Sequence, residues 1–285
     1  MEDRIWAAIV AALPAEAKRT GQTHSDRSVL MVGLWAVLWD RPNCWACRED
    51  AWQGRPLPPL TRPSESTISR RFWPLVAELG ETLASRIAAV LPPEPLAAVD
   101  GKPLPVGGGS GDRDAKAGRA VGHKAKGYKL FAVIDRAGRV LAAEIGGLNR
   151  AEQTVAKRLY RRLPKTVLTV VGDGVYDSVP LHRVADESGV RHVSPLRENR
   201  VGRRQQPERL KLQALLATAE GQTLLEERDH IERRFGLMGN IGCGYKGLPN
   251  WVRREHRVNA WMRGKICIYH AWLALQATNT PQNAA

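Results

Sequence analysis

The sequence predicts an α/β protein in which a mixed sheet is flanked by helices and preceded by a small helical N-terminal domain. Three observations predict this fold class. Residues 1 to about 90 carry apolar side chains at helical spacing. After a proline-rich linker at 92–95, short apolar runs typical of buried strands begin, the clearest at 166–172. Segments of helical periodicity separate these runs. We therefore expect a helical domain at 1–91 and an α/β domain at 96–276.

The N-terminal domain contains a helix whose start is marked by Ser64, a residue type that caps helices, directly before Glu65. Short hydroxyl and arginine side chains gather in its first two turns. In a helix-turn-helix domain, such side chains on the recognition helix contact phosphates or base edges. The alternative is a capped surface helix. The candidates for DNA contact on this helix are Ser66, Thr67, Arg70 and Arg71.

The second domain alternates strands with helices. Residues 96–100 form a short apolar run that ends in an acid and indicates a buried strand ending at Asp100. Two β-rich runs, 129–135 and 139–145, are joined by a tight turn. Asn149 and Glu152 have the spacing of a capping box and open a helix to about residue 163. The remaining elements are a strand at 166–172, a helix at 178–188 that Gly189 ends, a strand at 191–194, a basic loop at 197–211, and helices at 226–238 and 252–275.

The charge balance favours a polyanionic partner. The chain has 285 residues and a formal net charge of +14. Nucleic acid is the first candidate, because each neutralised phosphate releases counterions. An acidic membrane surface is the rival, but the sequence has no strongly amphipathic basic helix and no apolar run of membrane-spanning length. Without a basic N-terminal region typical of a signal peptide, we expect a cytoplasmic protein that has no contact with membranes.

Four cysteines do not make a disulfide scaffold in a chain of this length. Cys44 and Cys47 have the spacing of zinc ligands, and Cys267 with His270 could supply a second pair. The pairs lie far apart in sequence, and the second falls in a helix-like run. We therefore interpret the cysteines as small buried hydrophobic residues in preference to a zinc site.

Three acidic residues form the candidate catalytic set. Asp100 and Asp173 each follow a predicted buried strand, and ligands of α/β sheets gather at the carboxyl ends of strands. Glu232 lies on a predicted helix among arginines. Three converging carboxylates suit Mg²⁺, and two such ions can activate a water for phosphodiester cleavage. Taken singly, each aspartate is more typical of a turn or cap, and Glu232 of a pair with Arg228. The three gain weight only together and with the positive charge.

Several motifs around these acids resemble those of DDE transposases from bacterial insertion sequences, the insertion-sequence-4/5-like group. The resemblance covers residues 96 to about 275 and its combination of motifs is specific. The matching stretches are Val-Asp-Gly-Lys-Pro-Leu at 99–104, Gly-Asp-Arg-Asp-Ala-Lys at 111–116, Gly-Tyr-Lys-Leu at 127–130, Gly-Asp-Gly-Val-Tyr-Asp-Ser at 172–178, and Arg228 with Ile-Glu-Arg-Arg-Phe at 231–235.

The resemblance implies an RNase H-like core in which Asp100, Asp173 and Glu232 hold Mg²⁺ or Mn²⁺, as two ions. It implies an insertion at about 195–228. Water would attack the phosphodiester at the element end, and the freed 3′-hydroxyl would attack target DNA. The partners would be double-stranded DNA, both element ends and target, and further copies of the chain in a homodimer or larger assembly on DNA.

The chain departs from the family pattern at two positions, Leu225 and Gly239, where the family often has Tyr and Lys. Two alternatives therefore stay open: a catalytically impaired DNA-binding relative, and an RNase H-like nuclease without strand transfer. Basic residues of the second domain are candidates for phosphate contact, although each alone is more typical of a solvated face. The candidates are Lys124, Lys126, Lys129, Arg203, Arg204, Arg228, Arg233 and Arg234.

Overall fold

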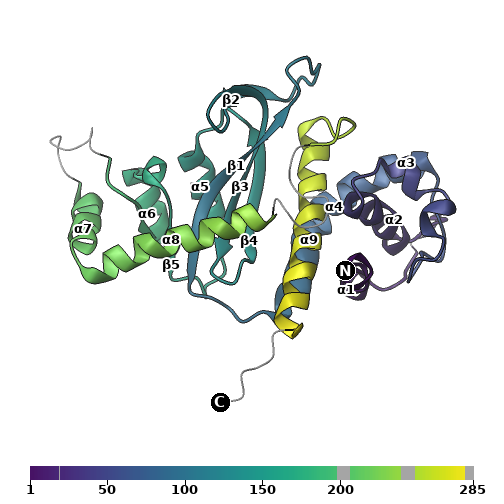
Figure 1. Ribbon diagram of the computed structural model, residues 1–285, viewed down its shortest axis with the longest axis horizontal. Coiled ribbons are helices and arrows are strands. Elements are labelled where there is room, and N and C mark those ends of the chain that lie inside the picture. The colour runs from purple at the N-terminus through teal and green to yellow at the C-terminus, as the bar shows by residue number, and fades with distance from the viewer. Residues whose placement is uncertain (19, 198–205, 239–247, 280–285) are drawn as a thin grey trace. The chain divides into compact units, whose positions relative to one another are not determined.

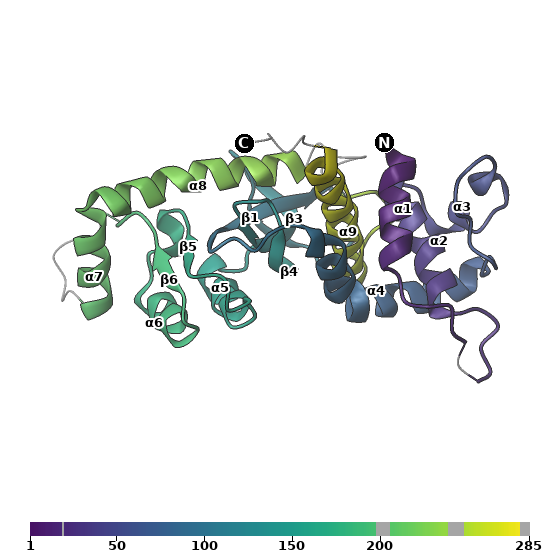
Figure 2. The ribbon, with the colours of Figure 1, turned by 90° about the horizontal axis from the view of Figure 1, so that it is seen from below.

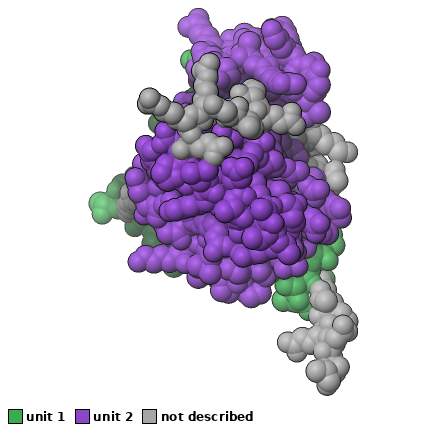
Figure 3. Space-filling model, turned by 90° about the vertical axis from the view of Figure 1, so that its left-hand side faces the viewer, with its two compact units in different colours: residues 1–91, 240–285 green, residues 92–239 purple. Residues whose placement is uncertain are grey.

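The computed structural model describes residues 1–18, 20–197, 206–238 and 248–279. The chain divides into two compact units, coloured separately in Figure 3. Unit 1 comprises residues 1–91 and 240–285, and unit 2 comprises residues 92–239. No helix among the described residues is both long and apolar enough to cross a membrane.

Unit 1 is helical, as predicted for residues 1–90 (Figure 1). Its helices are α1 Glu2–Ala12, α2 Asp26–Leu38, α3 Asn43–Ala46, α4 Glu65–Ile87 and α9 Glu255–Asn279, with 3₁₀ turns η1 Asp50–Trp52 and η2 Ala88–Val90. Every residue of α2 from Ser28 to Leu38 is buried. Tryptophans fill much of this core: the ring centroids of Trp6 and Trp52 each lie 4.9 Å from the ring centroid of Trp35. The unit therefore has a hydrophobic core of its own.

Helix α4 begins where the sequence predicts. The side chain of Ser64 accepts a hydrogen bond from the Thr67 amide at 3.4 Å, which confirms the cap. Residues 39–64, with α3 and η1, separate α2 from α4. These two helices are therefore not joined by the short turn of a helix-turn-helix motif. Whether α4 contacts DNA stays a prediction.

Helix α9 packs along α4 within unit 1. Its Cys267 thiol donates to the carbonyl of Gly80 at 3.6 Å, and Nδ1 of His270 lies 2.8 Å from the carbonyl oxygen of Ala84. The predicted α/β domain of 96–276 would include most of α9. The contacts of α9, however, group this helix with the N-terminal helices. Where the catalytic domain ends in sequence stays a prediction.

Unit 2 is built on a six-stranded mixed sheet. Strands β1, β3 and β4 are antiparallel neighbours, and β5 and β6 continue the sheet parallel to β1. The order β4-β3-β1-β5-β6, with β2 pairing the outer end of β3, is RNase H-like and confirms the predicted fold class. The strands are β1 Leu96–Val106, β2 Lys116–Arg119, β3 Lys124–Asp135, β4 Val140–Gly147, β5 Thr169–Val171 and β6 Arg191–Val193.

Helices cover both faces of this sheet, as Figures 1 and 2 show. Helices α5 (Glu152–Tyr160) and α6 (Val179–Glu187) lie on one face, where side chains such as Val99, Phe131 and Leu159 form the core. Helix α8 (Ala219–Met238) crosses the other face and contacts β1, β3, β5 and β6. Helix α7 (Pro207–Leu216) precedes it, and η3 (Gly174–Tyr176) follows β5.

Strand β1 does not end at Asp100, so that prediction is wrong. It runs on to Val106, because the whole segment pairs with β3, with Asp100 opposite Ala132. The apolar run stops at Asp100, but the backbone pairing continues through Pro103 and Pro105.

Two other local predictions are corrected. The capping box is wrong: the N-cap of α5 is Ala151, without a side-chain hydrogen bond, and Glu152 is bound elsewhere. Residues 207–211 begin helix α7 rather than completing a basic loop, and 198–205 lie outside the described residues. The hairpin of β3 and β4 is confirmed, as is the end of α6 at Gly189, whose φ of +73° suits glycine.

Candidate active site

Asp100 and Asp173 come from neighbouring parallel strands. Ala98 of β1 is in register with Val171 of β5, so the residues that follow each lie at the same end of the sheet. The core on the α5–α6 face takes Val99, and alternation along the strand therefore directs Asp100 to the face that α8 covers. The structure thus brings the first two predicted acids together at the carboxyl end of β5.

Each carboxylate is held by a backbone amide close to it in sequence. Oδ1 of Asp100 accepts from the amide of Gly101 at 2.6 Å, and Oδ1 of Asp173 accepts from the amide of Val175 at 2.8 Å. Within the described part of the chain, Oδ2 of neither aspartate takes part in a hydrogen bond. One oxygen of each therefore has lone pairs that could bind a cation.

Burial raises the pKa of Asp100 above its ordinary value of 3.8. The amide of Gly101 opposes this by stabilising the charged form. The carboxylates of Glu152 and Asp173 raise the pKa further, and the ammonium of Lys129 lowers it. Asp100 therefore lies among like charges, and a cation would relieve their repulsion.

The pKa of Asp173 is raised for the same reasons. Burial is the largest cause and Glu152 adds to it, while the amide of Val175 and the charges of Arg228 and Arg197 act in the opposite direction. Arg228 was predicted as a phosphate contact, and it lies close enough to Asp173 to affect its charge. Arg197 was not predicted.

Helix α8 passes over this site. Nζ of Lys102, two residues beyond Asp100, donates to the carbonyl of Phe235 at 3.3 Å, and Arg228 acts on Asp173 from the same helix. Glu232 lies on the α8 backbone between these two residues, four after Arg228 and three before Phe235. Its side chain is outside the part that the structure describes, so the convergence of three carboxylates stays a prediction.

The donors in place fit a hard divalent cation. Asp100 and Asp173 offer carboxylate oxygens, both are partly buried, and their charges repel each other. No three His, Cys, Asp or Glu side chains within the described ranges are already arranged around a metal position. Two aspartates do not complete the coordination of such an ion, so further ligands would come from α8 or from water.

Lys129 is not a surface residue, although it was predicted as a DNA contact. It is 8% exposed, and its ammonium lies 2.5 Å from Oε1 of Glu152. Its neighbours along β3, residues 128 to 135, are all buried. The position of this lysine inside an apolar run was the sequence signal that could have identified it as a buried residue in an ion pair.

Asp177, an acid to which the sequence analysis gave no role, fixes the turn that carries Asp173. It is fully buried, and its Oδ2 accepts from the amide of Arg197 at 3.0 Å and pairs with Arg209 at 3.1 Å. Nε of Arg197 donates in turn to the carbonyl of Gly174 at 2.6 Å. These bonds tie the segment after β6 and helix α7 to the turn beside the site.

The other predicted DNA-contact residues of unit 2 differ in exposure. Lys124 and Arg233 are exposed. Nζ of Lys126 donates to the carbonyl of Ser110 at 2.7 Å, and Arg234 is partly buried. Arg203 and Arg204 lie outside the described residues.

The predicted contacts on α4 also separate into two groups. Ser66 and Arg70 are exposed and Thr67 is partly exposed in the first two turns. Arg71 instead donates to the carbonyl of His24 at 2.7 Å and pairs with Asp26 at 2.6 Å. Its guanidinium is held by contacts within unit 1.

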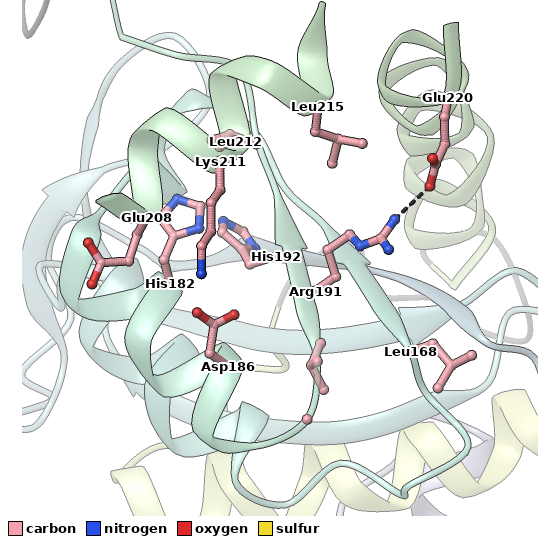
Figure 4. A pocket seen from close by; sticks show the side chains of 12 residues that line it. Leu168, His182, Asp186, Arg191, His192, Glu208, Lys211, Leu212, Leu215 and Glu220 are labelled. Carbon is pink, nitrogen blue, oxygen red and sulfur yellow. Dashed lines mark hydrogen bonds and ion pairs between the residues drawn. The ribbon is translucent and has the colours of Figure 1, made fainter. Parts of the chain in front are cut away.

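A separate cavity of about 700 Å³ lies at the opposite end of the sheet (Figure 4). It is lined by Leu168, which directly precedes β5, and by Arg191, the first residue of β6, together with His182 and His192. Arg191 pairs there with Glu220 at 2.6 Å. Since Asp173 follows the carboxyl end of β5, this cavity is not part of the acidic site.

The family model for the transposase DDE domain matches residues 91–269, more than half of the chain. The chain belongs to the transposase DDE domain family. Proteins of this DDE family generally use divalent metal ions, in agreement with the acidic site described above. No curated protein sequence matches the chain.

Solved structures similar to this DDE-family chain include transposase complexes. A piggyBac transposase synaptic complex with hairpin DNA matches with 15% identity and a TM-score of 0.36, over 74% of this chain and 50% of that chain. A pre-cleavage Mos1 transpososome matches with 11% identity and a TM-score of 0.25, over 79% and 81%. A Mos1 paired-end complex with the left transposon end matches with 10% identity and a TM-score of 0.24, over 82% and 84%. The chain spans half the length of the piggyBac chain.

Proposed function

We propose that the chain is a transposase of the insertion-sequence-4/5-like group that cleaves DNA at element ends and joins them to target DNA. The observation that carries this proposal is the pair Asp100 and Asp173, two partly buried and mutually repelling carboxylates beneath α8. Membership of the DDE family supports the same reaction class.

In this proposal Asp100, Asp173 and Glu232 bind two Mg²⁺ or Mn²⁺ ions. The ions, when bound, supply a lowered pKa for a water and charge stabilisation for the leaving oxygen. The chain's own acids fix the position of these charges, and the backbone amides of Gly101 and Val175 fix the orientation of the two aspartates. Glu232 is assigned because it lies on α8 between two residues that reach the site.

Cations around the site would hold the DNA backbone. Arg228 and Lys102 approach the aspartates from α8 and β1. The exposed Arg119 and Lys124 lie on the β2–β3 ribbon, which continues the sheet beyond the level of Asp100. We propose double-stranded DNA as the partner, bound by a dimer or larger assembly of the chain.

Leu225 favours a second candidate, a relative that binds DNA but cuts it poorly. This position, where the family often has Tyr, is a partly buried leucine in α8. An RNase H-like nuclease without strand transfer is the third possibility.

A supercoiled plasmid carrying the element ends, incubated with the protein and Mg²⁺, separates the three. A transposase gives cleavage at the ends and joined products. Cleavage without joining would identify a nuclease, and tight end binding without cleavage would identify the impaired relative and overturn the proposal.

A further inference from the structure

Lys129 and Glu152 form an ion pair next to the proposed metal site. Nζ of Lys129 lies 2.5 Å from Oε1 of Glu152, and the two side chains are 10% and 17% exposed. Lys129 comes from β3 and Glu152 from the first turn of α5. Two charged groups this far from solvent are held in one geometry, because separating them would leave a charge without a partner.

The backbone beside Asp100 leaves room for this pair. A Cβ atom on Gly101 would lie 2.8 Å from Cδ of Lys129 and 3.2 Å from Cδ of Glu152. The pair therefore packs directly on the residue that follows Asp100 and that donates to its carboxylate. Any larger residue at 101 would displace the pair.

Glu152 lies against Gly101, the residue that follows Asp100. Its charge raises the pKa of Asp100 more than the charge of Asp173 does, and it also raises the pKa of Asp173. The charge of Lys129 acts on Asp100 in the opposite direction. The pair thus places one negative and one positive charge against Gly101, beside Asp100 in the chain.

We propose that Lys129 and Glu152 are positioning residues that set the affinity of the acidic site for divalent cations, Glu152 strengthening it and Lys129 limiting it. This inference rests on the proposed function, because it assumes that Asp100 and Asp173 bind the cation. Neither residue needs to touch the ion. Each acts through the electrostatic potential at the two aspartates.

The two single variants should change Mn²⁺ affinity in opposite directions, which distinguishes this role from a purely structural one. Glu152→Gln removes a negative charge near the site and should weaken Mn²⁺ binding roughly tenfold. Lys129→Met removes the positive charge and leaves Glu152 unpaired, so it should tighten Mn²⁺ binding roughly tenfold. If the pair only supported the fold, both changes would weaken binding.

The experiment is a calorimetric titration of Mn²⁺ alone into the full chain, for the wild type, the two single variants and the double variant. The double variant keeps the net charge of the wild type and should bind within about threefold of it. Circular dichroism and thermal unfolding without metal verify that each variant is folded. If Lys129→Met fails to fold, Lys129→Arg replaces it as the comparison. Lys129→Arg keeps the positive charge, so this variant should bind Mn²⁺ with the affinity of the wild type.

Asp173→Asn is the control for the function itself. If it binds Mn²⁺ as the wild type does, the proposed metal site is wrong and the inference falls with it. If Asp173→Asn loses binding but Glu152→Gln binds as tightly as the wild type, or Lys129→Met binds more weakly, only the role of the pair is overturned.

Discussion

Asp100, Glu152 and Lys129 illustrate at the residue scale how burial decides the role of a charged side chain. An exposed lysine on a basic protein is free to contact phosphate, but Lys129 is buried and paired with Glu152. Asp100 is partly buried near the carboxylates of Glu152 and Asp173, and its pKa is raised as a result. Burial also shifts the pKa of a histidine, His192, at the other end of the sheet.

His192 should make the protein less stable in acid. It is 5% exposed, burial lowers its pKa from 6.5 to about 3, and the nearby His182 contributes. Because its pKa is lower in the folded state, its contribution is complete above pH 6.5 and is lost as the pH falls towards 3. The loss is about 1.4 kcal/mol per pH unit, or about 2 kcal/mol between pH 6.5 and 5.

Urea unfolding at pH 7.5 and pH 5.0 measures this contribution. In His192→Gln the side-chain amide can still form a hydrogen bond with the hydroxyl of Tyr160, which lies 2.8 Å from Nδ1 of His192, but it cannot ionise. The variant should therefore lose about 2 kcal/mol less than the wild type between the two pH values. An identical pH dependence in both proteins would show that His192 is not the titrating group.

At the scale of elements, helix α4 offers a matched pair of adjacent arginines. Arg70 is exposed, and among the residues that the structure describes its side chain bonds only to the carbonyl of Ser66, one turn earlier. Arg71 pairs with Asp26 and the carbonyl of His24. Arg70→Ala should weaken DNA binding without changing the melting temperature, whereas Arg71→Ala should cost about 1–3 kcal/mol of stability.

Fluorescence anisotropy with duplex DNA and thermal unfolding test both variants. Equal DNA affinity of Arg70→Ala and the wild type would indicate that α4 is a capped surface helix and not a DNA-contacting one. An unchanged melting temperature for Arg71→Ala would contradict the structural role of its ion pair.

Element by element, the sequence predicts the sheet better than the bounds of its strands. The hairpin, β5, α6 and the cap of α4 followed from local patterns at Gly189, Ser64 and the β-branched run. The continuation of β1 past Asp100 could not be predicted, because pairing with β3 sustains it through two prolines. Glu152 had the local spacing of a capping residue, and only the tertiary structure brings it to Lys129.

The site was predicted in the same uneven way. Asp100 and Asp173 could be singled out in the sequence because each follows an apolar strand segment, and the structure brings them together. Arg197 and Asp177 were not, because their contacts join segments on either side of β6. Glu232 had the weakest support from the sequence pattern until its motif was matched by resemblance, and its place in the site stays a prediction.

At the scale of the whole molecule, the net charge of +14 predicts DNA binding that depends strongly on salt. With six or more phosphate contacts, affinity should fall about a thousandfold between 50 and 200 mM salt. Lys124→Ala, on the exposed ribbon, should reduce the slope of log K against log salt by about one. Lys165→Ala, an exposed lysine before β5, is the control and should leave the slope unchanged. An affinity that is constant over this range would contradict the electrostatic account.

The central claim, that Asp100 and Asp173 form a metal-dependent DNA-cleaving site, is tested most directly by the Asp173→Asn variant. The measurement is nicking and cleavage of end-bearing plasmid in Mg²⁺, with duplex binding measured in parallel. Asp186→Asn makes the same change on an exposed residue of α6, beside the cavity at the other end of the sheet. We predict that Asp173→Asn lowers cleavage at least about a thousandfold with DNA binding retained, as expected for loss of a metal ligand, and that Asp186→Asn cleaves as the wild type does. Wild-type cleavage by Asp173→Asn would contradict the account.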